Sequence, residues 1–391
     1  MNDEWVCTSL GDAVAIKKGR KPSEFSTTGG QAPYLIADFL RGKPASAWVD
    51  NDPNLVWATE LDSLLLWDGA GAGDVFPGRA GAVASTMARL RPTMGGLTGG
   101  FFQLAAQFLM PSIKASNRGT TVPHVNPDAL KALPLLVPPL TVQRRIVDLM
   151  AHLDNHLANL QTERDAADVL ISGAIDSVVH SIFEESKLVP LESVLQMKPT
   201  YGVVKPGQDP VDGILLVRSG DVSLGEVSTA SLRRITSDLN EEYRRSQIRR
   251  GDVLVALVGN PGAVAVAPDE LEGHNIARQV GLLRCAEEVQ PLFLELLLAS
   301  TLGQHQLSAS IKGAVQKVIN LGDLAQIRLP IPELPDQQVH LDWYQAGKAW
   351  ISKLNEEIAA ASILRSQVLG SLLSGNTPIS STYDLIIPEV A

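Results

Sequence analysis

The chain has few of the residues that build disulfide-linked, zinc-binding or membrane-spanning structures. Its 391 residues include only two cysteines, Cys7 and Cys285, and 5% aromatic residues. Two distant cysteines without a CxxC spacing exclude a disulfide framework and a zinc cluster, and they fit a reducing compartment. No apolar run approaches the roughly 18 residues that span a bilayer, and residues 1–4 lack the basic start of an export signal. We therefore expect a cytoplasmic, globular protein without membrane contact.

Motifs of several enzyme classes are also missing. There is no GxxxxGK[ST] phosphate loop, and the one Pro-Pro pair, at 138–139, lies outside a [DNS]PP[YFW] methyltransferase motif. The glycines at 69, 71 and 73 lack the third glycine of a dinucleotide fingerprint, so they predict a turn. His152 and His156 are four residues apart but lack the HExxH context of a metal site. We predict a non-catalytic chain that holds no cofactor or metal.

Positive charge is in deficit, because the formal net charge is -10. Residues 1–139 carry 12 basic and 12 acidic side chains, whereas residues 140–187 carry 4 and 8. Residues 188–333 carry 14 and 17, and residues 334–391 carry 3 and 6. This distribution opposes unaided binding to a polyanion, since such binding depends on neutralising phosphates. Any nucleic-acid contact is therefore expected in local basic loops, with a partner that adds positive surface.

The sequence contains an internal repeat. A shift of 194 carries Gly119 to Gly313, Leu130 to Leu324, Pro138 to Pro332 and Gln143 to Gln337. Upstream the shift is 181, which aligns residues 10–14 with 191–195 and Leu35-Ile36 with Leu216-Val217. Glycine matched to glycine and proline to proline at a constant shift indicates a duplication, with insertions in the second copy.

Each copy predicts short strands, then a helical stretch near 102–110 or 292–307, a glycine loop, a proline-rich segment and a long helix. The long helices should run from near Thr141 to about 183 and from about 335 to 374, roughly 60 Å at ~1.5 Å per residue. Each carries one apolar stripe, so we expect an antiparallel pair that buries both stripes and places the two domains at opposite ends about a pseudo-twofold axis.

The predicted fold class is α+β, with two duplicated mixed domains separated by two long antiparallel helices. The expected segments are a first domain at 1–139, a first helix at 140–186, a second domain at 187–333, a second helix at 334–376 and a tail at 377–391.

Several motifs resemble those of one family. The letters LPLLVPPL at 133–140 followed by QRRIV at 143–147 resemble the "PLPPLxEQRRIV" helix start of type I restriction-modification specificity subunits. The second copy, IRLPIP at 327–332, is similar but has Gln338 where the family has arginine. LWDG at 66–69 with GAVAST at 81–86 resembles the recognition-domain pattern "WDG…AG…G…ST". GNPG at 259–262 with NIAR at 275–278 resembles its variant, and the resemblance extends to about residue 375.

This resemblance implies a subunit whose two domains each read one half of a split double-stranded DNA target. It implies that the helices space the domains and bind two modification (methyltransferase) subunits. S-adenosylmethionine, ATP and magnesium would then belong to the modification and restriction subunits. The alternatives are a tandem-domain scaffold that does not bind DNA, which would suit the acidic charge, and a standalone methyltransferase or nuclease, which the missing motifs disfavour.

Basic and amide side chains in glycine-containing loops are the candidates for DNA contact, because phosphates and base edges accept hydrogen bonds from such groups. The alternative for each is a solvated surface charge. The predicted contacts are Lys17, Lys18, Arg20, Lys21, Arg118 and Thr120 in the first copy, and Arg218, Ser219, Arg278, Gln279, Lys312, Gln316 and Lys317 in the second.

Overall fold

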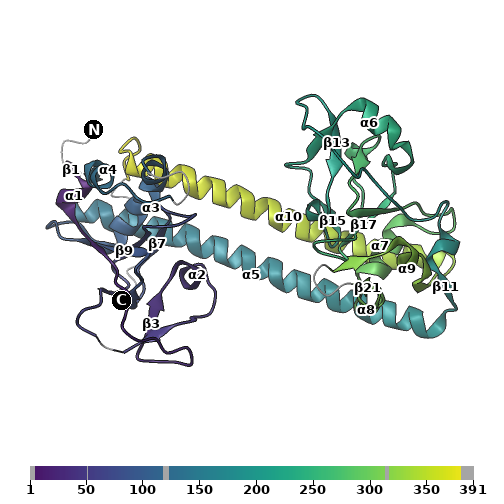
Figure 1. The fold of residues 1–391 in the computed structure, drawn as a ribbon, viewed down its shortest axis with the longest axis horizontal. Helices are drawn as coiled ribbons and strands as arrows, with labels where there is room; N and C mark the ends of the chain where they lie inside the picture. Colours follow the sequence, from purple (N-terminus) through teal and green to yellow (C-terminus); the bar gives the residue numbers. More distant parts are fainter. Residues whose placement is uncertain (1–4, 51, 118–122, 313–316, 380–391) are drawn as a thin grey trace. The chain divides into compact units, whose positions relative to one another are not determined.

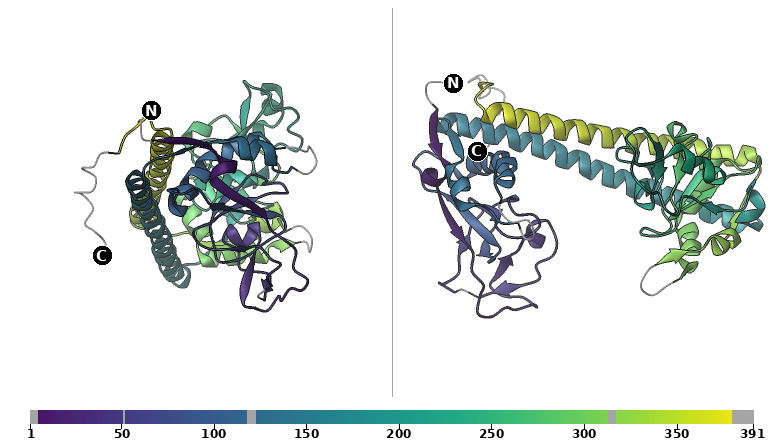
Figure 2. Two further views of the ribbon diagram at one scale, coloured as in Figure 1. Left: turned by 90° about the vertical axis from the view of Figure 1, so that its left-hand side faces the viewer. Right: turned by 45° about the horizontal axis from the view of Figure 1, so that its top comes forward.

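The structure is a computed structural model, and it describes residues 5–50, 52–117, 123–312 and 317–379 (Figures 1 and 2). The chain divides into two compact units. Unit 1 comprises Met1–Asn159 and Glu357–Ala391, and unit 2 comprises Leu160–Glu356. Each unit therefore contains one globular domain together with parts of both long helices.

The elements of the first domain alternate short strands with short helices. They are β1 (Val6–Ser9), α1 (Leu10–Ala13), β2 (Val14–Lys18), β3 (Ala32–Leu35), α2 (Ala37–Leu40), β4 (Trp48–Val49), β5 (Trp57–Ala58), β6 (Ser63–Leu66), β7 (Val75–Pro77), β8 (Gly81–Val83), β9 (Met87–Pro92), α3 (Gly99–Ala115), α4 (Pro127–Ala132) and β10 (Pro134–Val137). The first long helix is α5 (Leu140–Glu185).

The second domain repeats this order with additions. Its elements are β11 (Leu188–Pro190), η1 (Leu191–Val194), β12 (Thr200–Tyr201), β13 (Ile214–Val217), η2 (Ser219–Asp221), β14 (Val222–Ser223), β15 (Glu226–Val227), β16 (Arg233–Ile235), α6 (Ser237–Glu242), η3 (Arg244–Ser246), β17 (Val253–Ala256), β18 (Val264–Val266), η4 (Asp269–Leu271), β19 (Asn275–Ile276), β20 (Val280–Leu283), α7 (Pro291–Ala299), α8 (Thr301–Ala309), β21 (Ile311–Lys312), β22 (Val318–Ile319), α9 (Leu321–Gln326) and β23 (Arg328–Pro330). The second long helix is α10 (Leu334–Leu373).

The main sheets of the two domains correspond strand for strand, and the second sheets correspond except for β5, which has no named counterpart. The order β2-β9-β6-β7 in the first is matched by β12-β20-β17-β18 in the second, and the pair β1-β10 by β11-β23. A second sheet, β4-β3-β8-β5, is matched by β16-β13-β19, and in both the central pairing is parallel. The hairpin β14-β15 and helix α6 have no counterpart in the first domain, and they account for the insertions that the sequence comparison required.

The structural register corrects one detail of the sequence alignment. Leu35 of β3 pairs with Val83, and the corresponding residue that pairs with Ile276 is Val217, not Leu216. The sequence of β13 could not show this shift of one position in the alignment, because β13 is a run of apolar residues and each of them fits a buried strand position. The upstream alignment of Leu10 with Leu191 is consistent with the structure, since both donate their backbone N–H to the segment before the proline-rich strand.

A buried acid and an arginine connect the central strands of the main sheet in both domains. Arg91 donates two hydrogen bonds to Asp62 at 2.6 and 2.7 Å, and Arg284 donates to Asp252 at 2.8 and 2.7 Å. The acids precede β6 and β17, and the arginines lie on β9 and directly after β20, so the pairs are equivalent. The repeat is thus preserved in polar interactions of the core as well as in strand order.

Each domain packs against both long helices within its own unit. In unit 1, Ile146 and Met150 of α5 and Leu369 of α10 join the core formed by α3 and the main sheet. In unit 2, Val179 of α5 and Tyr344 of α10 join the core formed by α7 and its main sheet. Within each unit the two helices run antiparallel, as the views in Figures 1 and 2 also show. The predicted fold class is confirmed.

The prediction that the pair buries both apolar stripes is wrong in part. Val169 and Leu170 on α5 are 75% and 64% exposed, and Trp350 and Leu364 on α10 are 40% and 51% exposed. A helix packed against a single partner helix covers only a narrow face, so residues beside that seam stay in contact with solvent.

Polar contacts also tie unit 2 to its helices. Glu295 of α7 is fully buried and accepts hydrogen bonds from Val266 N, the Tyr344 hydroxyl and Lys348 Nζ. Asp176 of α5 accepts from the backbone N–H and the hydroxyl of Thr301, at the start of α8. The predicted helix at 292–307 is broken into α7 and α8 at Ser300, the N-cap of α8, whose hydroxyl accepts from Gly303 N–H at 3.0 Å.

One helix in the described part of the chain, α5, is long and apolar enough to cross a membrane by length and composition, over Leu140–Glu184. This is weak evidence, because core helices of soluble proteins pass the same test. Ile175, Val179 and Ile182 of α5 contribute to the core of unit 2.

Candidate nucleic-acid interface

In unit 1 several candidate segments meet at one end of the main sheet, around the turn between β6 and β7. Trp67 at the start of this turn donates its N–H to Thr86 O, and Asp68 forms a β-bridge with His124. Lys18, the last residue of β2, places its ammonium 2.7 Å from an Asp68 carboxylate oxygen. The WDG segment, the Ser-Thr segment and the basic segment are therefore neighbours, although they lie far apart in the sequence.

Unit 2 brings the equivalent segments together. Leu257, at the start of the turn between β17 and β18, donates its N–H to Gln279 O. Val258 bridges to Val318, which follows Lys317. A Cβ on Gly259 would lie 3.5 Å from the Ser219 hydroxyl, so η2 adjoins the same turn. Four of the predicted contact residues, Ser219, Arg278, Gln279 and Lys317, thus lie on segments that converge on one turn.

Two equivalent glycines allow this convergence. A Cβ on Gly19 would lie 2.1 Å from Ala84 O, and one on Gly202 would lie 1.7 Å from Ile276 O. No side chain fits at either distance, so only glycine lets the chain after the first strand of the main sheet approach the parallel pair of the second sheet. The basic segment of unit 1 is therefore fixed against the sheet end and is not a free surface loop.

Five predicted contact residues are exposed and available. In the described part of the chain, the side chains of Lys17, Lys21, Arg278, Gln279 and Lys317 have no hydrogen-bond or ion-pair partner. Uncommitted donors of this kind can bind a phosphate or a base edge without first breaking an internal interaction.

Other predicted contacts are already engaged. Lys18 pairs with Asp68, and Arg20 donates to Asn54 O at 3.3 Å. Arg218 makes a bidentate pair with Asp221, at 3.0 and 2.9 Å, which raises the pKa of its guanidinium. This pair fixes η2 beside the turn, so Arg218 positions the neighbouring backbone.

The remaining predicted contacts fall on segments of which little is described. Arg118, Thr120 and Gln316 lie outside the described residues, and for Lys312 only the backbone, at the end of β21, is described. They stay predictions.

Sequence analysis missed Tyr201, which is 50% exposed and directly precedes Gly202. An exposed aromatic ring beside Gly202 can stack on a base or make an apolar contact with it, as aromatic residues on nucleic-acid-binding surfaces do. Its only sequence signal was its place one residue before a glycine that corresponds to Gly19.

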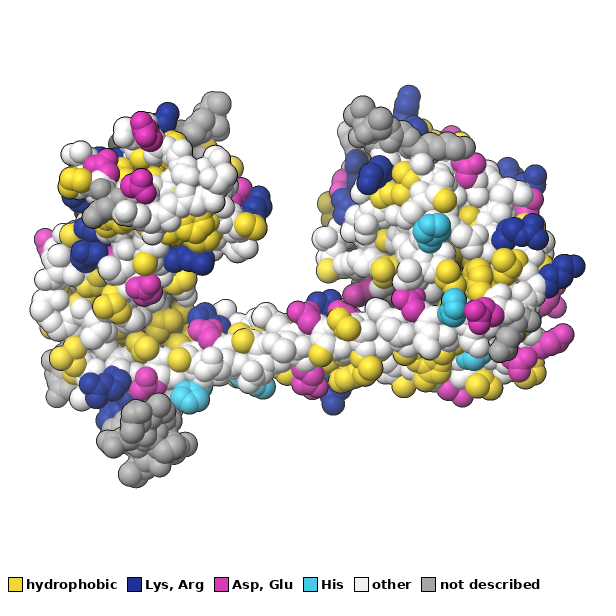
Figure 3. Space-filling view, turned by 90° about the horizontal axis from the view of Figure 1, so that it is seen from below, with side chains coloured by type: hydrophobic (Ala, Val, Ile, Leu, Met, Phe, Trp, Pro, Cys, Tyr) yellow, Lys and Arg dark blue, Asp and Glu magenta, His cyan; other side chains and the backbone are white. Residues whose placement is uncertain are grey.

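Surface charge on the face shown in Figure 3 is mixed. Lys and Arg side chains stand among Asp and Glu side chains, with apolar groups between them. This agrees with the acidic composition and with the expectation that positive contacts are local.

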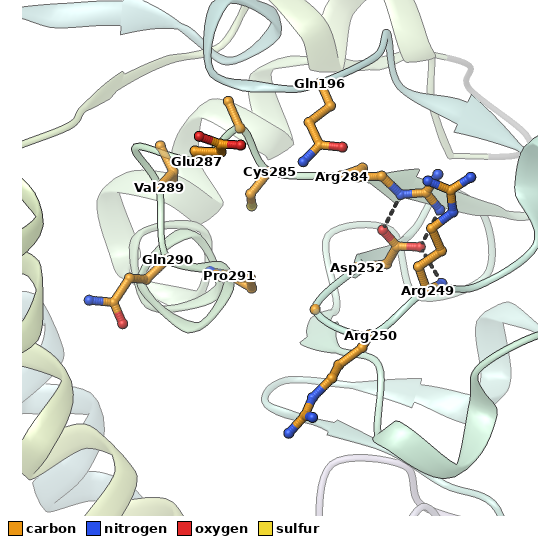
Figure 4. A pocket seen from close by; sticks show the side chains of 12 residues that line it. Gln196, Arg249, Arg250, Asp252, Arg284, Cys285, Glu287, Val289, Gln290 and Pro291 are labelled. Carbon is orange, nitrogen blue, oxygen red and sulfur yellow. Dashed lines mark hydrogen bonds and ion pairs between the residues drawn. The ribbon is translucent and has the colours of Figure 1, made fainter.

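A hollow in unit 2 lies at the opposite end of β17 from the turn, with a volume of about 450 Å³ (Figure 4). Its lining includes Arg249, Arg284, Cys285 and Glu287. Burial, together with the charge of Asp252, raises the pKa of the Cys285 thiol to about 12. The thiol is therefore protonated at neutral pH and is a poor nucleophile.

The duplicated architecture, two α+β domains each packed against two long helices, defines a class of tandem-domain proteins. Comparison with known proteins identifies the family. The sequence profile described as "Type I restriction modification DNA specificity domain" matches residues 2–167 and again residues 178–360. The chain belongs to this family and contains two of its specificity domains, and this favours the DNA-specificity interpretation over a scaffold that does not bind DNA.

Individual relatives agree with this assignment. The chain is 26% identical over 369 residues to the type I restriction enzyme EcoBI specificity subunit of Escherichia coli, covering 86% of this chain and 78% of that one. It is 22% identical over 400 residues to the MjaVIII specificity subunit of Methanocaldococcus jannaschii, covering 97% and 94%.

Solved structures share the fold. The S subunit of a type I restriction-modification system from M. genitalium matches with a TM-score of 0.52 at 12% identity, over 97% of this chain and 98% of that one. A chain from a study of complex assembly and conformational transition of the type I R-M system matches with a TM-score of 0.57 at 17% identity, over 95% and 98%.

Proposed function

We propose that this chain is the non-catalytic, sequence-reading subunit of a cytoplasmic type I restriction-modification complex, and that each domain reads one half of a two-part DNA target. The observation that carries the proposal is the convergence of equivalent segments on one turn in each domain. The described reading residues are Lys17 and Lys21 in unit 1 and Arg278, Gln279 and Lys317 in unit 2.

The chemistry of reading follows from these side chains. Lysine ammonium groups bind phosphates and fix the position of the protein on the duplex. Arginine and glutamine can make paired hydrogen bonds with the major-groove edges of guanine and adenine. Arg278 and Gln279 are adjacent and uncommitted, so they are the best-placed residues for base contact in unit 2.

The partners proposed are double-stranded DNA, two modification subunits and restriction subunits. S-adenosylmethionine, ATP and magnesium are assigned to these partners. The exposed apolar residues of the long helices and the net charge of -10 support a chain that works within an assembly.

The test is methylation mapping in cells that express this chain with its modification subunit. A two-part sequence with a fixed gap is expected, and it should disappear when this chain is omitted. Methylation without any dependence on this chain would refute the proposal. A second measurement compares the purified chain with the assembled complex, and tight, specific DNA binding is expected only from the complex.

A further inference from the structure

One glutamine near the start of each long helix has an unusual environment. Gln143 on α5 and Gln337 on α10 are both fully buried, in a protein whose other long-helix glutamines are exposed wherever the structure describes them. We call these two residues the helix-start glutamines. Buried amides are tolerated only where their hydrogen bonds are satisfied.

The side chain of Gln143 bonds to two segments of unit 1, residues 96–98 and Pro138. Its Oε1 accepts hydrogen bonds from the backbone N–H and the hydroxyl of Thr98, both at 2.9 Å. Its Nε2 donates to Gly96 O at 2.5 Å and to Pro138 O at 2.8 Å. Thr98 is the N-cap of α3, so the first turn of the long helix is bonded directly to the start of the domain helix.

Gln337 repeats this arrangement in unit 2. Its Oε1 accepts from the N–H of Gln290, the N-cap of α7, at 2.9 Å. Its Nε2 donates to Glu288 O and to Pro332 O, both at 2.8 Å. The bonded partners are equivalent in the two copies, although the domain sequences around them differ.

These bonds differ in kind from the apolar contacts beside them. Side chains such as Ile146 stabilise the packing without fixing a direction, because the hydrophobic effect is non-directional. Hydrogen bonds to two backbone segments, one of them at the start of the domain helix, constrain both the distance and the angle between two helices. Only a carboxamide supplies an acceptor on one side and two donors on the other, so neither glutamate nor leucine can replace it.

We infer that Gln143 and Gln337 are positioning residues for DNA reading: each fixes the direction of its long helix relative to its recognition domain, and together they set the gap between half-sites. This inference rests on the proposed function. Because one base pair advances the duplex by about 3.4 Å, a small change in the angle at the helix start is enough to alter which gap fits.

The experiment measures DNA binding by the assembled complex with modification subunits. The probes are duplexes that carry the mapped half-sites with the native gap, or with the gap changed by one or two base pairs. The readout is the ratio of affinity for the native gap to affinity for each altered gap. The variants are Gln143→Leu and Gln337→Leu, with Gln143→Glu as a variant that keeps the acceptor side but sets an oxygen against the carbonyls of Gly96 and Pro138.

Two controls separate positioning from stability. Gln161→Leu removes an exposed glutamine of the same helix. Ile146→Val removes a methyl group from the core of unit 1 beside Gln143, and it destabilises the unit without removing the directional bonds. Neither should change the ratio.

The expected result is at least a ten-fold fall in the ratio for all three variants, with the bases read in each half-site unchanged. An equal loss of affinity on all gaps would overturn the inference, because that is the result of a purely structural role. A wild-type complex with no two-part target would instead refute the proposed function.

Discussion

At the scale of single residues, availability distinguishes the candidate contacts better than charge does. Arg218 and Arg278 have the same side chain, but the guanidinium of Arg218 is committed to Asp221, whereas that of Arg278 is exposed and uncommitted. Substituting Arg218 would break its pair with Asp221, so it would loosen η2 as well as remove a positive charge. Substituting Arg278 removes only a surface donor, which makes it the cleaner probe of DNA contact.

We predict that Arg278→Ala and Lys317→Ala weaken DNA binding by the assembled complex in different ways. Loss of a base contact by Arg278 should cost about 1–3 kcal/mol and relax specificity at one position. Loss of a phosphate contact by Lys317 should weaken all sequences alike and reduce the salt slope by about one. Binding measured over a range of salt concentrations and target variants separates the two.

Arg250→Ala is the matched control for this comparison. Arg250 is 77% exposed and pairs with Asp269, at the opposite end of β17 from the turn. Its loss should change neither affinity nor salt slope. Equal effects of all three substitutions would show that binding depends on overall charge and not on the turn.

Gly19 provides a steric prediction. In Gly19→Ala the new methyl group would overlap Ala84 O and Val83 O, at 2.1 and 2.2 Å. Both are backbone atoms that cannot rotate away, so we expect a loss of about 1–3 kcal/mol of folding stability. Thermal unfolding of the full chain measures it. Gly95→Ala is the control, since nothing lies within 4 Å of its added Cβ; equal melting temperatures would contradict the close approach.

At the scale of elements, the sequence predicted most reliably what both copies retain. Proline-rich segments, helix-start glutamines and long helices were correctly placed because Pro138, Gln143 and their repeats stand at a constant shift. The break between α7 and α8 was not predicted, because the sequence alone did not show that Ser300 caps α8 or that Asp176, 125 residues away, accepts a hydrogen bond from Thr301. The exposed residues of the apolar stripes were wrongly predicted to be buried. Helical periodicity shows which face of a helix is apolar, but it does not show how much of that face a partner helix covers.

The candidate site was predictable by segment and not by contact. Segments named from the sequence lie beside one turn in each domain, but the pairing of Arg218 with Asp221 and of Lys18 with Asp68 depends on tertiary geometry. A list of basic residues cannot distinguish a free donor from one that already has a carboxylate partner.

The pair of Asp62 with Arg91 joins β6 and β9 and makes stability depend on pH. Burial of Asp62 acts to raise its pKa, but hydrogen bonds from Arg91 and Thr59 and the charge of Arg91 outweigh it, so the pKa lies below the ordinary 3.8. Because the folded-state pKa is the lower one, this stabilisation is complete above about pH 4 and is lost as the pH falls through the folded-state value.

We predict that Asp62→Asn lowers the free energy of unfolding by about 2 kcal/mol at pH 7, a value reduced by the exposure of Arg91. The difference from the wild type should shrink below pH 4, where Asp62 of the unfolded chain takes up a proton before Asp62 of the folded protein does. Denaturant unfolding at pH 7 and pH 3 measures both. Asp50→Asn, at an exposed position, is the control, and a difference that persisted unchanged at pH 3 would exclude the charged pair as its source.

At the scale of the whole molecule, the repeat separates two tasks. The turns that carry the candidate contacts belong to the domains, whereas the long helices belong to both units and carry none of the predicted contacts. A protein organised in this way should change its target in two independent ways. Exchange of a domain should change the bases that are read, and a change in helix length should alter the distance between them.

We predict that replacing residues 1–133 with the matching domain of a relative changes only one half of the DNA target. Inserting four residues into α5 near Asn159 adds about one turn, roughly 6 Å, and should alter the gap or prevent assembly while the bases read stay the same. Asn159 is exposed and is the last α5 residue of unit 1, so the insertion leaves both cores intact. Methylation mapping in cells that carry each variant reports both effects. A domain exchange that altered both half-sites, or neither, would contradict a protein with two independent readers.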